Sequence, residues 1–286
     1  MLKPRTKTLF LIFLSCALIN FQSNLLAFHF IADADIHCDG TGITTPNKGG
    51  HLELMQELKD NPNIDLRFVL FPGDLTDHGK VGNCSLLCMP QLDEWGEFLN
   101  MWYTPLHQKN ISVYLCPGNH DDSRNWVTGS VYNKIKEMNR GQDYYSFDIG
   151  KNEEKVHFIC CGIYPNNKTL TWLTQDLSHT SPLTPTFIFF HYNLTGQWSD
   201  FWSKAEKEQF YQVIQNQNVK AIITGHIHTS YSTIWKGIPV IGVGGKHFAL
   251  INFDPPTKNI EVTFHAPGEN KEFDEVRVDW EELDKE

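Results

Sequence analysis

The chain lacks several features that would assign it to a protein class at once. After residue 27 it has no apolar run of the ~20 residues that a membrane-spanning helix requires, so no later transmembrane segment is predicted. It has no CxxC pair, which argues against a cysteine-based zinc site. It also has no internal repeat and no Gly/Ser linker. We therefore expect residues 28–286 to form one domain.

The chain also lacks an excess of positive charge. Its 286 residues include 24 Lys and Arg against 34 Asp and Glu, a net charge of −10. An acidic chain is a poor partner for phosphate backbones, so nucleic acid is a disfavoured partner unless a bound metal supplies local positive charge. Hydrophobic residues make up 41% of the chain and aromatic residues 13%, which is enough for a sizeable core and argues against disorder.

Residues 1–27 have the order of a secretory signal peptide. Lys3, Arg5 and Lys7 precede an apolar run from residue 9 to residue 19, and a polar patch and "LLA" follow. This order predicts cleavage after Ala27 and a secreted or periplasmic protein. The run is shorter than a membrane anchor needs. Lipid attachment at Cys16 is a minor alternative, because the preceding residues match such sites weakly.

Six cysteines follow residue 27, and an even number in an exported chain permits disulfides. Cys84 and Cys88 flank a short loop and are the best pair. Cys116, Cys160 and Cys161 lie in apolar strand-like runs, so we expect them to be buried as small hydrophobic side chains.

Apolar strand-like runs alternate with amphipathic helical patterns along the chain. Strands are predicted at 28–35, 65–71, 111–116, 184–190 and 219–225, and helices at 49–60, 89–108, 169–179 and 200–217. A hairpin is predicted at 144–162, and further strands follow residue 230. The alternation predicts a largely parallel sheet, and the hairpins add antiparallel strands. We therefore predict an α/β fold of two facing mixed β-sheets flanked by helices.

Each of the five strands is followed by polar side chains that could hold a metal. They are Asp35 and His37 in "DADIH", Asp74 and Asp77 in "GDLTD", Asn119, His120 and Asp121 in "PGNHDD", His191 in "FIFFH", and His226 and His228 in "GHIH". Ligands of open α/β sheets bind beyond the carboxyl ends of the strands. Each motif alone is explained by turn chemistry or a core histidine, but all five together predict a metal site.

The number of donors indicates more than one metal ion. A structural zinc needs four ligands, whereas seven hard or borderline donors are present here: Asp35, His37, Asp74, Asn119, His191, His226 and His228. Such a set suits two divalent ions that share a bridging carboxylate. Manganese, iron and zinc all accept mixed imidazole and oxygen ligands.

These motifs resemble those of the calcineurin-like metallophosphoesterases. The segments "DIH", "GDLTD", "GNHD", the strand-end "H" and "GHIH" occur in the order of that family, from about Phe28 to Asp254. The resemblance implies an α/β/β/α sandwich and a binuclear phosphoesterase that hydrolyses phosphate mono- or diesters by attack of a metal-bridging hydroxide. It implies a first metal held by Asp35, His37, Asp74 and His228, and a second completed by Asn119, His191 and His226, with Asp74 bridging. His120 would be the catalytic acid that faces the substrate, and Asp77 would orient it.

The substrate stays open at this point. "PGNHDD" with "GDLTDHG" resembles bacterial cyclic-nucleotide phosphodiesterases, whereas "DIHCD" resembles the exported acid sphingomyelinase branch; exported phosphatases are a third relative. A catalytically inactive metal-binding domain is disfavoured, because no ligand of the motifs is missing. Trp198, Phe201 and Trp202 could line a pocket for a base or lipid, or they could begin the next helix and pack inward.

Overall fold

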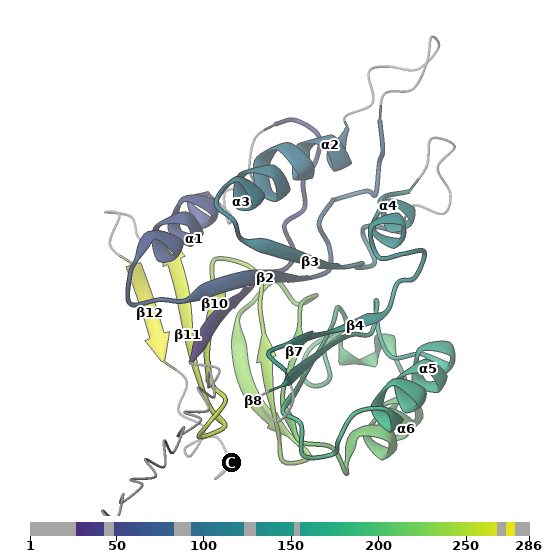
Figure 1. Ribbon diagram of the computed structural model, residues 1–286. Helices are drawn as coiled ribbons and strands as arrows, with labels where there is room; N and C mark the ends of the chain where they lie inside the picture. Colours follow the sequence, from purple (N-terminus) through teal and green to yellow (C-terminus); the bar gives the residue numbers. More distant parts are fainter. Residues whose placement is uncertain are drawn as a thin grey trace, which may run out of the picture.

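The computed structural model of the protein describes residues 27–42, 49–82, 93–122, 130–151, 155–267 and 273–277. Two six-stranded mixed sheets face each other (Figure 1). The first sheet has the order β12-β11-β10-β1-β2-β3, in which β1–β2–β3 are parallel and β10, β11 and β12 are antiparallel. Its strands are β1 (Phe28–Ala32), β2 (Leu66–Pro72), β3 (Ser112–Cys116), β10 (Phe248–Asp254), β11 (Asn259–Pro267) and β12 (Phe273–Arg277).

The second sheet has the order β4-β5-β6-β7-β9-β8. Its four central strands run parallel, and the hairpin partners β4 and β8 run antiparallel at the two edges. The strands are β4 (Tyr145–Ile149), β5 (Val156–Cys160), β6 (Thr186–Phe190), β7 (Val219–Thr224), β8 (Tyr231–Trp235) and β9 (Ile238–Gly242). The predicted fold class, two facing mixed sheets flanked by helices, is confirmed.

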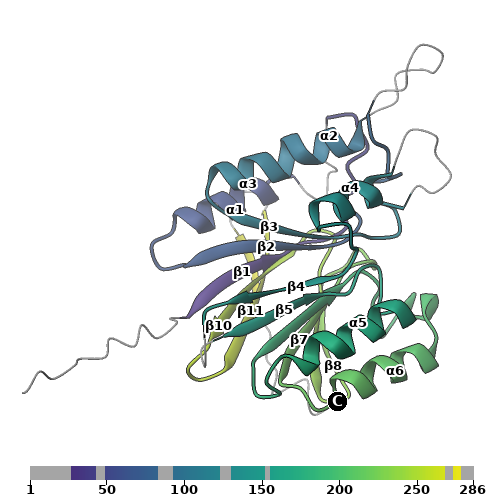
Figure 2. The same cartoon turned by 45° about the vertical axis from the view of Figure 1, so that its right-hand side comes forward.

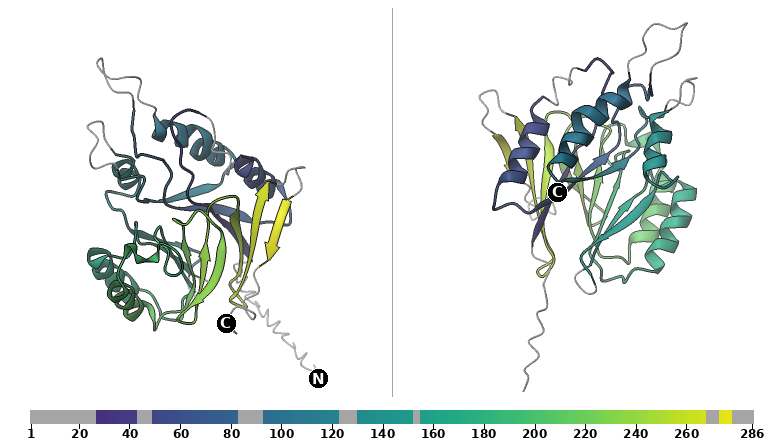
Figure 3. Two further views of the ribbon diagram at one scale, coloured as in Figure 1. Left: turned by 180° about the vertical axis from the view of Figure 1, so that it is seen from behind. Right: turned by 45° about the horizontal axis from the view of Figure 1, so that its top comes forward.

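Helices cover the outer face of each sheet. On the first sheet lie α1 (His51–Asp60), α2 (Glu94–Phe98), α3 (Thr104–Gln108) and α4 (Val131–Met138); on the second lie α5 (Asn167–Ser178) and α6 (Lys204–Ile214) (Figure 2). Views from behind and from above keep the same layers, with strands inside and helices outside (Figure 3). The structure thus has a helix–sheet–sheet–helix order.

Phenylalanine side chains fill the space between the two sheets. Phe30 of β1 stacks on Phe68 of β2 at 5.1 Å between ring centroids, and its edge meets Phe158 and Phe187 of the second sheet at 5.3 and 5.2 Å. All four rings are buried. Aromatic pairs in such tilted and offset arrangements add to the energy of burial. The two sheets are therefore held at a fixed separation.

The starts of the predicted helices 49–60 and 169–179 lie within two residues of those of α1 and α5, whereas the other two predicted helices differ more at their starts. Within 89–108, residues 89–92 lie outside the described part, and α2 begins at Glu94 because the side chain of Asp93 accepts a hydrogen bond from the amide of Gly96. A π-helical turn, Leu99–Tyr103, then joins α2 to α3. Helix α6 begins at Lys204 rather than at residue 200, because Ser203 forms a capping box with Glu206.

Other sequence predictions concern the cysteines and the N-terminus. Cys116, Cys160 and Cys161 are buried with free thiols, as expected. Cys84, Cys88 and residues 1–26 lie outside the described residues, so the disulfide and the signal peptide stay predictions. Within the described residues, every helix is too short or too polar to cross a bilayer.

Candidate metal centre

The carboxyl ends of the two sheets meet at one edge of the sandwich. The imidazole of His191, after β6, donates from Nδ1 to the carbonyl of Pro72 at the end of β2 (2.9 Å). The amide of Gly225, after β7, donates to the carbonyl of His191 (3.0 Å). These bonds bring together the polar segments that follow β2, β6 and β7. Ligands of α/β sheets bind beyond such carboxyl ends of the strands.

The backbone turns sharply at most of the predicted ligands. Positive φ angles of 51–80° occur at Asp35, His37, Asp74, His226 and His228. Residues other than glycine seldom adopt this conformation, and it persists where surrounding contacts enforce it, often at functional sites. The turn directly after each strand therefore aims these side chains into a common space.

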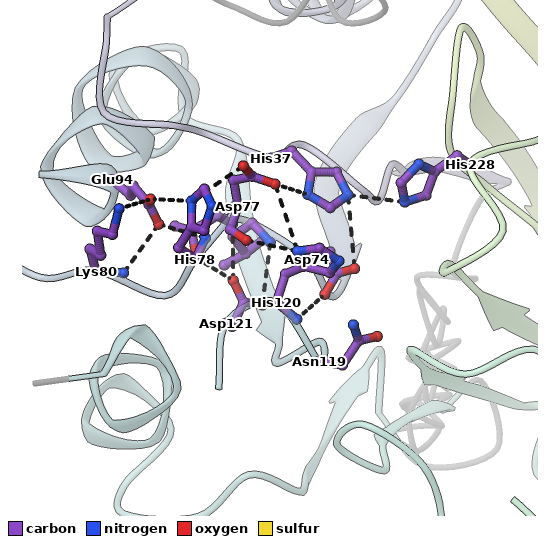
Figure 4. Close-up of polar contacts among 12 residues, drawn as sticks. His37, Asp74, Asp77, His78, Lys80, Glu94, Asn119, His120, Asp121 and His228 are labelled. Atoms are coloured by element: carbon purple, nitrogen blue, oxygen red, sulfur yellow. Dashed lines mark hydrogen bonds and ion pairs between the residues drawn. The ribbon is translucent and has the colours of Figure 1, made fainter. Parts of the chain in front are cut away.

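One group of side chains gathers around His37. Its Nε2 lies 3.0 Å from Nε2 of His228 and 3.9 Å from Oδ2 of Asp74 (Figure 4). Asp35 joins these three, and one ligand atom from each lies within 4.8 Å of all the others. These are the four residues predicted for the first metal.

A second group gathers around His191. Its Nε2 lies 3.2 Å from Oδ2 of Asp74, 3.2 Å from Nδ1 of His226 and 3.0 Å from Oδ1 of Asn119. The structure thus brings together all three residues predicted for the second metal, with Asp74 again beside them.

The donor geometry fits divalent cations. Ligands held about 2.0–2.2 Å from one ion lie roughly 3.0–3.5 Å apart, and the shortest contacts of both groups are 3.0–3.2 Å. The Nε2 atom of His226 is buried without a hydrogen-bond partner, which is costly for a polar atom unless a ligand satisfies it. Asp74 contributes to both groups, as a bridging carboxylate must.

The charges of the site also favour cations. Burial lowers the pKa of His37 and of His226 to about 4, so both imidazoles are neutral, which is the form that binds metal. Burial opposes the charged forms of Asp74 and His191, but their mutual attraction outweighs it, lowering the pKa of Asp74 and raising that of His191 to about 9. A bound cation would replace the His191 proton as the counter-charge of Asp74.

His120 differs from its neighbours because its ring is not in either ligand group around Asp74. Its amide donates to Oδ1 of Asp74 (2.8 Å), and its Nδ1 donates to the main-chain carbonyl of Asp77 (2.7 Å). The side chain is 39% exposed. These bonds orient the ring and leave Nε2 available to a substrate.

The carboxylate of Asp77 lies farther from His120 than its carbonyl does. Oδ1 is 3.7 Å from Nδ1 of His120 and 3.3 Å from Nδ1 of His37, and Oδ2 is 3.2 Å from Nδ1 of His78 (Figure 4). The short contact that orients His120 therefore comes from the main chain. An orienting role for the Asp77 carboxylate stays a prediction.

Asp121 has a structural role that the motif alone did not reveal. It is fully buried and accepts hydrogen bonds from the amides of Leu75, Thr76 and Gly118 and from the Thr76 hydroxyl, at 2.8–3.3 Å. These bonds tie the "GDLTD" turn to the "GNHD" turn. In the sequence, the position of Asp121 at the end of "GNHD" was the only indication of this role.

Gly118 allows the same two turns to touch. A Cβ atom at this position would lie 2.1 Å from Oδ1 and 2.2 Å from the amide nitrogen of Asp74, where no side chain fits. Glycine is thus required by close backbone approach.

Glu94 of α2 is a second residue whose role the sequence did not indicate. Its buried carboxylate accepts hydrogen bonds from the amides of His78 and Lys80 (2.9 and 3.1 Å) and lies 3.0 Å from Nδ1 of His78. It thereby anchors the turn that carries Asp77 to the helix layer. No local pattern in the sequence links residue 94 to residue 78.

The three aromatic residues after His191 divide between the two predicted roles. Trp202 is buried and packs against Phe190 and Phe210. Phe201 and Trp198 are 55% and 48% exposed, and their rings lie 4.7 and 6.2 Å from that of His226. The tryptophan nearest α6 packs inward, and the other two rings border the site.

Comparison with known proteins agrees with this geometry. A model of the family described as calcineurin-like phosphoesterase matches residues 28–230. The chain is similar to a protein of Psychrobacter sp. (strain PRwf-1) named "Probable cyclic nucleotide phosphodiesterase", with 25% identity over 154 residues. That match covers 48% of this chain and 43% of the relative, less than half of the relative's length.

Two solved structures share the fold at low identity. GAP50, described as the anchor in the inner membrane complex of Plasmodium, has a TM-score of 0.58 and 11% identity, with 89% of this chain and 90% of that chain covered. A dimetal phosphatase from Danio rerio has a TM-score of 0.56 and 13% identity, with 88% and 99% covered. Because the family match spans most of the chain and takes in the predicted metal ligands, the protein belongs to the calcineurin-like phosphoesterases.

Proposed function

We propose that this protein is a binuclear-metal phosphoesterase that hydrolyses small phosphate mono- or diesters. The observation that carries the proposal is the position of Asp74 in both ligand groups: its Oδ2 lies 3.2 Å from His191 and 3.9 Å from His37. A carboxylate between two imidazole clusters supports a site for two ions. Asp35, His37 and His228 would complete one side, and Asn119, His191 and His226 the other.

Two divalent ions in these positions would supply Lewis-acid activation of water and neutralise the phosphoryl oxygens. Manganese, iron and zinc all suit the donor set. The side chains listed above would hold the ions, and Asp121 and Gly118 keep the turns that carry Asp74 and Asn119 in contact.

His120 supplies the acid chemistry of the proposal. Its Nδ1 proton is committed to the Asp77 carbonyl, so Nε2 is the atom that can donate a proton to the leaving-group oxygen. The protonated ring would also stabilise negative charge that builds up on the phosphoryl group.

The test combines metal analysis with a substrate panel. Protein purified without chelator should contain two metal ions per chain, and after loading with manganese it should hydrolyse phosphomonoesters, cyclic nucleotides, linear diesters or sphingomyelin. Asp74→Ala should lose both ions, whereas Asp35→Ala should mainly weaken one. A fully active protein with one ion or fewer would refute the binuclear proposal.

Cyclic nucleotides are the second candidate substrate class, because the Psychrobacter relative carries the name of a cyclic nucleotide phosphodiesterase. A sphingomyelinase-like activity rests on the "DIHCD" motif alone. The same panel separates the two: rates on a cyclic nucleotide well above those on sphingomyelin would favour the first. Turnover of no substrate in the panel, with two metals bound, would favour a catalytically inactive metal-binding domain.

A further inference from the structure

Two exposed aromatic rings lie directly beside the metal centre. Among the described residues, only four large hydrophobic side chains are substantially exposed, and two of them, Trp198 and Phe201, adjoin His226. The other two are Met138, the last residue of α4, and Leu183, which precedes β6. Exposed apolar surface next to a reactive site is typical of a binding surface.

The segment that carries these rings is firmly held. The indole nitrogen of Trp202 donates to the carbonyl of Asn193 (3.0 Å). The side-chain Nδ2 of Asn193 donates in turn to the carbonyls of Thr195 and Gln197, at 2.7 and 2.8 Å. The Lys207 ammonium donates to the carbonyls of Leu194 and Ser199. Trp198 itself has a positive φ of 57°, a conformation that such contacts must enforce.

The rings form one wall with Tyr192 and His226. Tyr192 lies 5.2 Å from Phe201 and 4.7 Å from His226 between ring centroids, and Phe201 meets His226 edge-on at 89°. A substrate whose phosphate sits at His226 would therefore place its next chemical group against the exposed rings of Phe201 and Trp198.

We propose that Trp198 and Phe201 form a substrate subsite for a planar aromatic group, such as a nucleobase, attached to the phosphate ester. Flat rings bind planar π systems by stacking. Two exposed rings are a small apolar surface, which suits one base better than an acyl chain or a membrane surface. The inference rests on the proposed phosphoesterase activity and adds its substrate class.

The test uses substrate pairs that differ only in the base. Adenosine 3′,5′-cyclic phosphate is compared with 1-O-methylribose 3′,5′-cyclic phosphate, and adenosine 5′-phosphate with ribose 5-phosphate, on manganese-loaded protein. Phe201→Ala and Trp198→Ala should each raise KM for the base-bearing member about 5- to 100-fold, the range that loss of one stacking contact produces. KM for the base-free member should change less than about 2-fold, and metal content should not change.

Three further variants sharpen the result. Phe201→Tyr should restore stacking, whereas Phe201→Leu, which keeps apolar bulk without a flat ring, should behave like Phe201→Ala. Leu183→Ala removes an even more exposed apolar side chain elsewhere and should change KM for neither pair. An equal increase in KM on both members of a pair would overturn the aromatic subsite. A KM in Phe201→Leu equal to that of the parent would also overturn it and would indicate an aliphatic substrate group.

Binding separates this inference from the proposed function. Calorimetric titration of a non-hydrolysable phosphonate analogue of adenosine 5′-phosphate into manganese-loaded protein measures binding at the subsite without turnover. Weakened binding in Phe201→Ala with no hydrolysis of any substrate would refute the phosphoesterase and leave the subsite. Hydrolysis of base-free and base-bearing esters with the same KM in the parent would refute the subsite and leave the phosphoesterase.

Discussion

At the scale of single residues, the two neighbours Asn119 and His120 have different tasks because the chain turns between them. The Asn119 side chain points to His191, with 3.0 Å between Oδ1 and Nε2, whereas the His120 ring is held by the carbonyl of Asp77. One residue therefore belongs to the proposed ligand set, and we propose that the other faces the substrate. The difference can be measured by determining both turnover and metal content in variants of each residue.

His120→Asn should reduce turnover without reducing metal content. If His120 protonates the leaving group, its loss should lower kcat by about 10²–10⁴-fold on an alkyl phosphate ester. The loss should be much smaller on a nitrophenyl ester, because nitrophenolate leaves with little protonation. Steady-state kinetics on both esters, with metal analysis of each sample, make the measurement.

Asp77→Asn is the matched control. This variant keeps the main-chain carbonyl that accepts a hydrogen bond from Nδ1 of His120. Its kcat should therefore fall less than that of His120→Asn. Equal losses of His120→Asn on the two esters would assign the residue to charge stabilisation instead, and a loss of metal would make it a ligand.

At the scale of helices and strands, the sequence predicted those features that depend on residues close together in the chain. Apolar runs predicted the strands, and the polar residues directly after them predicted the site, because the carboxyl ends of parallel strands share an edge. The hydrogen bonds of Asp121 and of Glu94 could not be predicted, since they join segments that meet only in the fold. The division of Trp198 and Trp202 between surface and core likewise depends on where the capped helix α6 begins.

A cluster of ionic hydrogen bonds around the buried His157 joins β4, β5 and α5. His157 lies between Asp148 and Asp176, with nitrogen–oxygen distances of 2.6 and 2.8 Å, and Ser146 donates to Asp176. Burial alone would lower the pKa of His157, but the hydrogen bonds to Asp176 and Asp148 raise it above its usual value.

The His157 cluster should make stability depend on pH. Because the pKa of His157 is higher in the folded than in the unfolded chain, its stabilising effect is complete below the unfolded value near 6.5 and is lost as pH rises through the folded value. The free energy of unfolding of the parent should therefore exceed that of His157→Asn by more at pH 6 than at pH 9. Denaturant unfolding at the two pH values measures this, and a constant or widening gap at pH 9 would contradict it.

At the scale of the whole molecule, the N-terminal prediction is independent of the site. The basic start, apolar run and "LLA" predict that the mature protein begins near Phe28, which is also the first residue of β1. N-terminal sequencing of protein from its native source measures this. Met1 retained on the native protein would contradict cleavage and would favour an intracellular substrate such as a cyclic nucleotide.

The proposed metal ligands come from both sheets. Asp35, Asp74 and Asn119 follow strands of the first sheet, and His191 and His226 follow strands of the second. Ions bound between them would join the two halves of the sandwich at one edge, in addition to the phenylalanine core. Such ions bind the native chain, because the unfolded chain does not bring these ligands together.

Metal removal should therefore lower the stability of the whole sandwich. Free metal at 100 times its Kd adds about 2.7 kcal/mol per bound ion to the free energy of unfolding, which for a chain of this size corresponds to a Tm higher by roughly 5–10 °C for each ion. Calorimetric scans with and without chelator measure the shift. In Asp74→Ala, which lacks the shared carboxylate, manganese should leave Tm nearly unchanged. A parent protein whose Tm does not respond to saturating manganese would mean that manganese does not bind the folded chain, because any ion bound only by the native state raises Tm.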